Sequence, residues 1–152
     1  MDPLSDSPSG GGKAEGEQRG ALAAVAGQVR SGSRVLVAGA AIGDLCRQLK
    51  QQRRCEVDGY ELNARLAESA ASWCRQLRAG SPEGLLADDT AEPTFDAVVC
   101  HGLFEWLQAP EPVLARLKAA LRTGGAIVAA IPNAAYAGMA ACLATGEFRS
   151  GE

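Results

Sequence analysis

The chain has 152 residues, 47% of them hydrophobic, and a formal net charge of −3. This length suits one domain with a real hydrophobic core, and the acidic balance gives no general attraction to nucleic acid or to an anionic membrane. No apolar run approaches the length of a membrane span, and the N-terminus lacks the apolar core of a signal peptide, so we expect a cytoplasmic protein.

The five cysteines are scattered along the chain, which contains a single histidine. No C-x-x-C pair is present, so the sequence predicts neither a zinc site nor a disulfide framework. We expect the cysteines to be reduced and to pack as small apolar residues.

The first twenty residues differ in composition from the rest of the chain. Residues 1–20 are rich in Ser, Gly, Pro and charge, and they offer almost nothing to bury, so we expect this segment to be disordered. The folded domain is expected over residues 21–152. It opens with a short helix, because Leu22, Val25 and Val29 recur at helical spacing.

A strand, a turn and a helix follow in close succession. The apolar run over 34–39 predicts a buried strand, the small residues over 40–43 a tight turn, and the amphipathic pattern over 42–52 a helix. Gly39 and Gly43 lack a Cβ atom, so they can adopt positive φ and let backbone N–H groups approach a ligand. This unit is typical of the opening of a nucleotide-binding α/β sheet.

The second strand, over 55–60, is followed by an acid. Glu61 lies about 20 residues past the turn, where an acid can accept hydrogen bonds from ribose hydroxyls. Asn63 stands at the N-cap position of a further helix, which Gly80 closes. The apolar face of that helix is expected to consist of Leu66, Ala70, Trp73 and Leu77.

Three further apolar runs predict the remaining strands. They cover 85–87, 95–100 and 126–131, with a turn at 123–125 and a helix that begins near Pro112. Strands that alternate with helices in this way predict a parallel sheet with right-handed crossovers. Ligands of such sheets bind beyond the carboxyl ends of the strands.

Three segments together resemble the class I S-adenosylmethionine-dependent methyltransferases, in particular the type 11, 12 and 23 domains. The turn is similar to their D-x-G-x-G-x-G loop, with Val37 in place of the acid and Ala41 in place of the middle glycine. Residues 95–107 resemble the pattern F-D-x-V-x-x-x-x-x-L-E-H-L, with Trp106 at the histidine. Residues 122–125 resemble the family's R-P-G-G turn.

The resemblance covers residues 34–133 and implies a fold class. This is a Rossmann-like α/β fold, a three-layer αβα sandwich with a mostly parallel sheet of about five strands. The family sheet has seven strands, and the chain ends before the last two. We therefore expect a C-terminally incomplete domain whose fifth strand leaves an edge that a second copy or a completing partner could cover.

The resemblance also implies S-adenosyl-L-methionine as cofactor. Glu61 corresponds to the acid that grips the cofactor ribose, and the alternative for it is a solvated loop acid. Asp88 corresponds to the acid that recognises adenine after the third strand, and a simple turn is the alternative for the Asp88-Asp89 pair. The full set of expected cofactor contacts is Gly39, Ala40, Ala41, Gly43, Glu61, Leu62, Asp88, Asp89, Cys100 and His101.

His101 is the expected catalytic residue. It is the only imidazole of the chain and follows the fourth strand, where a substrate could reach it. Its unperturbed pKa lies near neutrality, so it could act as a general base. The alternative is a histidine that caps a loop or packs against the cofactor. No metal is expected, because the sulfonium of the cofactor is already activated and the protein mainly has to orient the acceptor.

The expected function is methyl transfer to a small-molecule or saccharide-type acceptor. Residues 134–148 resemble the helix and Gly-x-Phe turn of methyltransferases that often accompany glycosyltransferases. One alternative is a binding or remnant domain without turnover, which the missing acid at Val37 favours. Another is a tRNA wobble-uridine carboxymethoxy methyltransferase, whose His-x-x-x-Glu-Trp arrangement is similar to His101, Glu105 and Trp106. The acidic balance of the chain makes nucleic acid an unexpected partner.

Overall fold

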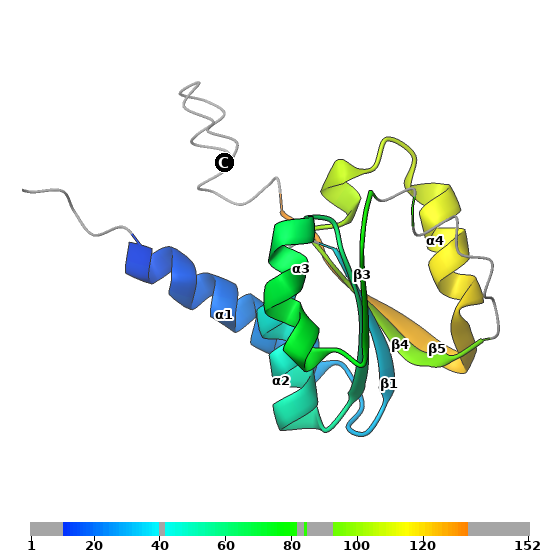
Figure 1. The fold of residues 1–152 in the computed structure, drawn as a ribbon, viewed down its shortest axis with the longest axis horizontal. Helices are drawn as coiled ribbons and strands as arrows, with labels where there is room; N and C mark the ends of the chain where they lie inside the picture. The colour runs from blue at the N-terminus through cyan, green and yellow to red at the C-terminus, as the bar shows by residue number, and fades with distance from the viewer. Residues whose placement is uncertain (1–10, 40–41, 82–83, 85–92, 134–152) are drawn as a thin grey trace, which may run out of the picture.

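The computed structural model describes residues 11–39, 42–81, 84 and 93–133 (Figure 1). Within them, five parallel strands form one sheet in the order β3-β2-β1-β4-β5. The strands are β1 (Arg34–Gly39), β2 (Glu56–Glu61), β3 (Gln76–Ala79), β4 (Phe95–His101) and β5 (Leu121–Ala130). The helices are α1 (Gly11–Gly27), α2 (Gly43–Arg53), α3 (Ala64–Ala70) and α4 (Pro110–Ala119), with short 3-10 turns η1 (Ala71–Trp73) and η3 (Phe104–Trp106).

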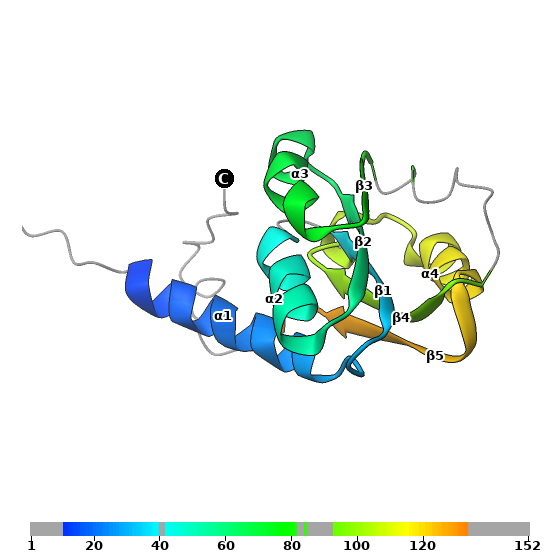
Figure 2. The ribbon, with the colours of Figure 1, turned by 60° about the horizontal axis from the view of Figure 1, so that its bottom comes forward.

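Helices cover both faces of the sheet, which makes three layers. Figures 1 and 2 show α1, α2 and α3 on one face and α4 on the other. Alternate residues of β1 point into separate apolar clusters, as a strand covered on both faces requires. The cluster under α1 and α2 includes Leu22, Val35, Val37, Leu45, Leu49 and Val99. The cluster under α4 includes Leu36, Val98, Leu103, Val113 and Leu117. The predicted fold class is confirmed.

Most predicted elements lie within a few residues of their expected places. Strand β1 has the predicted bounds, and α2, β2, β4 and α4 begin or end one or two residues away from theirs. The turn expected over 123–125 was wrong, because β5 already begins at Leu121 and these residues form a register shift inside the strand. Helix α1 begins at Gly11, so residues 11–20 are helical where we expected disorder. None of the described helices is both long enough and apolar enough to span a membrane.

The expected helix through Leu77 was wrong. Helix α3 ends at Ala70 and η1 at Trp73, and the chain then enters the sheet as β3. Just before β3, the Arg75 N–H donates to the Val57 carbonyl at 2.7 Å. Ala70, Trp73 and Leu77 pack in or against the cluster under α2, so this part of the apolar spacing served two kinds of element. Leu66, the first residue of the expected apolar face, is exposed, and its prediction was wrong. The predicted strand over 85–87 lies outside the described residues.

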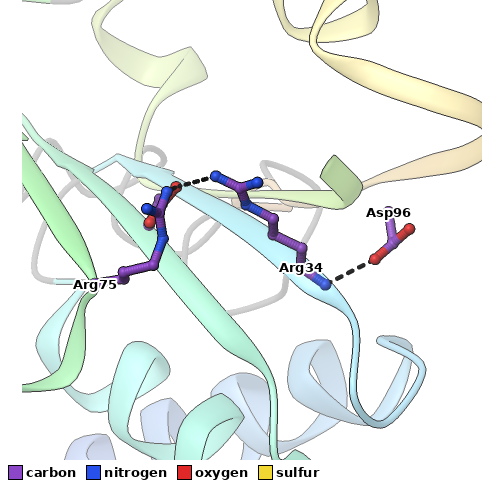
Figure 3. A network of polar contacts seen from close by, with 4 residues as sticks. Arg34, Arg75 and Asp96 are labelled. Atoms are coloured by element: carbon purple, nitrogen blue, oxygen red, sulfur yellow. Dashed lines mark hydrogen bonds and ion pairs between the residues drawn. The ribbon is translucent and has the colours of Figure 1, made fainter. Parts of the chain in front are cut away.

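A polar network crosses the amino-terminal half of the sheet (Figure 3). The buried Asp58 carboxylate accepts a hydrogen bond from the Arg75 guanidinium at 2.6 Å and forms an ion pair with Arg34 at 3.6 Å. The main-chain N–H of Arg34 donates to Asp96 at 2.8 Å, and Arg122 donates to the other oxygen of that carboxylate at 3.1 Å. These contacts tie β1, β2, β4 and β5 together, so Asp58 has a structural role.

Candidate cofactor site at the carboxyl edge of the sheet

Four of the predicted cofactor contacts come together at the carboxyl ends of three neighbouring strands. The register pairs Gly39 of β1 with Glu61 of β2 on one side and with His101 of β4 on the other. The Leu62 N–H donates to the Gly39 carbonyl at 3.0 Å. The chain crosses from one side of β1 to the other at this point, which is where open α/β sheets bind their ligands.

Gly39 is required by the close approach of two strands. Its φ is +144°, and a Cβ atom there would lie 1.7 Å from the main-chain oxygen of His101. Gly43 differs, because a Cβ atom at that position would meet the Ser69 hydroxyl oxygen at 3.4 Å, an ordinary contact. Steric contacts therefore explain why position 39 requires glycine. At position 43 the described contacts leave room for the methyl group of an alanine.

Glu61 faces the turn, as the ribose hypothesis requires. Its side chain is fully buried, and its two carboxylate oxygens accept hydrogen bonds from the main-chain N–H groups of Ile42, at 3.1 Å, and Asn63, at 3.0 Å. Ile42 immediately precedes α2, so the negative charge lies at the positive end of a helix. In the part of the chain that the structure describes, no Lys, Arg or His forms an ion pair with this carboxylate.

The geometry of Glu61 fits a ribose. An ionised carboxylate has about four lone-pair sites, and the two main-chain N–H groups use two of them. Two acceptor sites remain for a pair of neighbouring hydroxyl donors. Ala40 and Ala41, the other predicted contacts at the turn, lie outside the described residues.

The third strand of the structure is not the one from which the adenine-binding residues were predicted. Asp88 and Asp89 lie outside the described residues, and they were chosen as the residues just after a strand over 85–87. In the structure β3 ends at Ala79, so Gly80 and Ser81 follow the third strand. The Tyr60 hydroxyl donates to the Ser81 carbonyl at 2.7 Å, and the Gly80 N–H donates to the Glu61 carbonyl at 3.1 Å, which anchors this segment beside Glu61.

The residues at the end of β4 divide between core and edge. The Cys100 side chain is fully buried in the cluster under α4, and burial raises its pKa to about 12. Its thiol therefore faces the core, and only its main chain can contribute to a site at the strand end. His101 is partly buried at the last position of β4. In η3, Phe104 packs against the same cluster, whereas Trp106 is exposed.

Two features of the site were not predicted from the sequence. One is the hydrogen bond from the Ile42 N–H to Glu61, and the other is the placement of Ser81 after β3. The first had a signal, because the N–H groups of a helix start need acceptors from outside the helix. The second had none, because the only partly buried side chain of β3 is that of Leu77.

Comparisons with known proteins agree with this fold. The profile of a family described as a methyltransferase domain matches residues 36–127. A TehB-like S-adenosylmethionine-dependent methyltransferase from Corynebacterium glutamicum is 25% identical, with a TM-score of 0.56 over 76% of this chain and 70% of that one. A Haloferax volcanii protein solved in complex with the Trm112 methyltransferase activator is 16% identical, with a TM-score of 0.62 over 77% of this chain and 54% of its own.

A third solved structure contains a ligand. The Geobacter sulfurreducens S-adenosylmethionine-dependent methyltransferase, in complex with S-adenosylhomocysteine, is 16% identical, with a TM-score of 0.56 over 72% of this chain and 47% of that one. The chain thus spans about half the length of two of these relatives. No curated protein matches the sequence. Because the family profile covers more than half of the residues, the chain belongs to the methyltransferase-domain family, and its fold is that of the class I S-adenosylmethionine-dependent methyltransferases.

Proposed function

We propose that this chain binds S-adenosyl-L-methionine at the carboxyl edge of its sheet and transfers the methyl group to a small-molecule or saccharide-type acceptor. The observation that carries the proposal is Glu61, a fully buried carboxylate that faces the turn and whose partners among the described residues are two neutral N–H groups. Burying a charge without a cation is costly, and hydroxyl donors from a ribose would satisfy the remaining lone pairs. The S-adenosylhomocysteine complex of the Geobacter relative supports the same ligand.

Each residue of the site has a distinct task in this mechanism. The cofactor supplies a methyl group on an activated sulfonium, so the protein has to hold donor and acceptor in line. Glu61 fixes the ribose and, through Ile42, the start of α2. His101, at the end of β4, accepts the proton that an oxygen or nitrogen acceptor loses as it attacks the methyl group.

Calorimetric titration with S-adenosylhomocysteine tests the cofactor site. Glu61→Gln keeps one carbonyl acceptor but removes the charge, and we expect it to weaken binding about tenfold or more, because hydrogen bonds to a charged group contribute about 1.5–3 kcal/mol. Glu56→Gln is the matched control, an exposed acid at the other end of β2, and should leave the affinity unchanged. Absence of binding at millimolar ligand in the unmodified chain would leave only the remnant-domain alternative.

A second experiment tests the role of His101. Methyl transfer from radiolabelled S-adenosylmethionine to sugar nucleotides, small phenols and tRNA identifies the acceptor. With that acceptor, we expect His101→Ala to lower turnover at least tenfold while the affinity for S-adenosylhomocysteine stays the same. Unchanged turnover would assign His101 to the scaffold. Transfer to tRNA alone would replace the small-molecule proposal by the wobble-uridine alternative.

We also propose that the free side of β5 pairs with a second chain. Within the described residues, β5 pairs only with β4, and Ile131 directly after it is exposed. An unpaired edge strand is a template for further pairing. Sedimentation of the full chain should give a dimer that Ile127→Pro disrupts, whereas a monomer at all concentrations would contradict the proposal.

A further inference from the structure

Two cysteines lie side by side directly behind the turn. The Sγ atoms of Cys46, on α2, and Cys74, just after η1, are 3.5 Å apart. Both carry free thiols, and Cys46 is fully buried while Cys74 is partly exposed. They come from segments 28 residues apart in the sequence, so the fold brings them together.

The two thiols differ in acidity because they share a hydrogen bond. That hydrogen bond lowers the pKa of Cys74 and outweighs the opposite effects of burial and of the Asp58 charge. The shared hydrogen bond and burial raise the pKa of Cys46. Cys74 is therefore the sulfur that loses its proton first, and it is also the one that solvent can reach.

The cysteine pair is mechanically connected to the cofactor turn. The Cys46 N–H donates to the carbonyl of Ile42 at 2.9 Å, and the Ile42 N–H in turn donates to Glu61. Cys74 and Ile42 also pack on the same spot of β2, because a Cβ atom at Gly59 would lie 2.9 Å from the Cys74 sulfur and 3.1 Å from Ile42 Cδ1. A movement of Cys46 toward Cys74 would thus shift the residue that Glu61 holds.

We propose that Cys46 and Cys74 form a reversible disulfide when the protein meets a peroxide, and that this bond weakens cofactor binding at the turn. The Cys74 thiolate attacks one peroxide oxygen, the O–O bond breaks, and the released hydroxide takes a proton to become water. The resulting sulfenic acid is attacked by the Cys46 sulfur, the S–O bond breaks, and a second water leaves with the Cys46 proton. The two thiols lose two electrons, and the peroxide is reduced to two waters.

The bond requires a small movement. A disulfide has an S–S length of about 2.05 Å, so the sulfurs have to approach by roughly 1.5 Å from their present positions. The partly exposed Cys74 can contribute most of this movement, and the rest falls on the start of α2. The effect on the cofactor rests on the proposed function, whereas formation of the disulfide does not.

Peptide mapping tests the bond itself. Each of the five cysteines falls in a different tryptic peptide, because Arg47 follows Cys46 and Arg75 follows Cys74. After treatment of the reduced full chain with hydrogen peroxide and alkylation, we expect residues 35–47 linked to residues 66–75 in most molecules, and the link lost on reduction. Cys74→Ser should abolish it, while Cys55→Ser should retain it. Failure to find this peptide in the unmodified chain would overturn the inference.

Calorimetry then tests the consequence for the ligand. We expect oxidation to weaken the affinity for S-adenosylhomocysteine at least tenfold, reduction to restore it, and Cys74→Ser to be insensitive to peroxide. Equal affinity of the linked and reduced chains would overturn the coupling to the turn. If peroxide forms the disulfide but the reduced chain does not bind the ligand, the proposed function is contradicted. The cysteine pair would then remain a redox site without a link to the cofactor.

Discussion

The two halves of β2 each carry a buried carboxylate, and the two carboxylates have different kinds of partner. In the amino-terminal half, the polar network neutralises Asp58 with the side chains of Arg34 and Arg75. At the carboxyl edge, Glu61 lies three residues further along the same strand, and its hydrogen-bond donors in the described part of the chain are main-chain N–H groups. The first carboxylate thus has two cationic partners, whereas the second, within the described residues, has main-chain N–H partners alone. Under the proposed function, β2 carries one buried acid for stability and another for a ligand.

The largest expected effect comes from breaking the carboxyl edge. Gly39→Ala places a Cβ atom 1.7 Å from the His101 oxygen at a φ of +144°, so β1 and β4 have to separate. We expect a loss of about 3 kcal/mol or more in the free energy of unfolding, the range of strong overpacking and backbone strain. Denaturant unfolding followed by circular dichroism measures it.

The matched control is the other glycine of the turn. Gly43→Ala meets nothing closer than 3.4 Å, and it begins a helix, where alanine is favoured. Its stability should stay within about 0.5 kcal/mol of the unmodified chain. Equal losses for the two variants would show that the turn, and not the approach of β1 to β4, requires glycine.

The polar network should respond next. Asp58→Ala removes the shared partner of two arginines, and we expect a loss of about 2 kcal/mol, below the 3–5 kcal/mol of a fully buried pair because both arginines reach solvent. The affinity for S-adenosylhomocysteine should stay the same within a factor of two. A large loss of affinity with little loss of stability would reverse the roles assigned to the two acids.

For Glu61→Gln we expect the reverse: a small loss of stability and a larger loss of ligand affinity. The amide keeps one acceptor for a main-chain N–H and loses the other, which costs about 1 kcal/mol in unfolding free energy. The loss of ligand affinity described above should exceed this effect on stability. Thermal unfolding with and without S-adenosylhomocysteine measures both, because a ligand that binds only the folded state raises the melting temperature.

The sequence predicted this edge of the sheet better than its other parts for physical reasons. The β1 turn is marked by a glycine that sterics demand and by a run of apolar residues that two helical layers bury. Strand β3 carries no such mark, because it is an edge strand of four residues with mostly exposed side chains. The start of α2 indicated that its N–H groups need an outside acceptor, but the sequence did not identify Glu61 as that acceptor, because a main-chain N–H carries no residue-specific mark.

The smallest effect belongs to Asp96, at the margin of the polar network. The main-chain N–H of Arg34 and the guanidinium of Arg122 hold the pKa of this carboxyl below its ordinary value of about 3.9. A carboxyl whose pKa is lower in the folded state stabilises the protein above the unfolded pKa and loses this contribution as the pH falls through the folded one.

Asp96→Asn should therefore be less stable than the unmodified chain at pH 7 by about 1 kcal/mol or less, because the side chain is 40% exposed and screened by solvent. The difference should shrink as the pH falls below about 4. Urea unfolding of both chains between pH 7 and pH 3 measures it, and Arg122→Gln should reduce the difference by removing one cause of the low pKa. If the difference stays constant down to pH 3, the charge of Asp96 does not contribute to stability, and Asp96 acts only as a hydrogen-bond acceptor for the Arg34 N–H. Ionic pairing in the network would then be confined to Asp58.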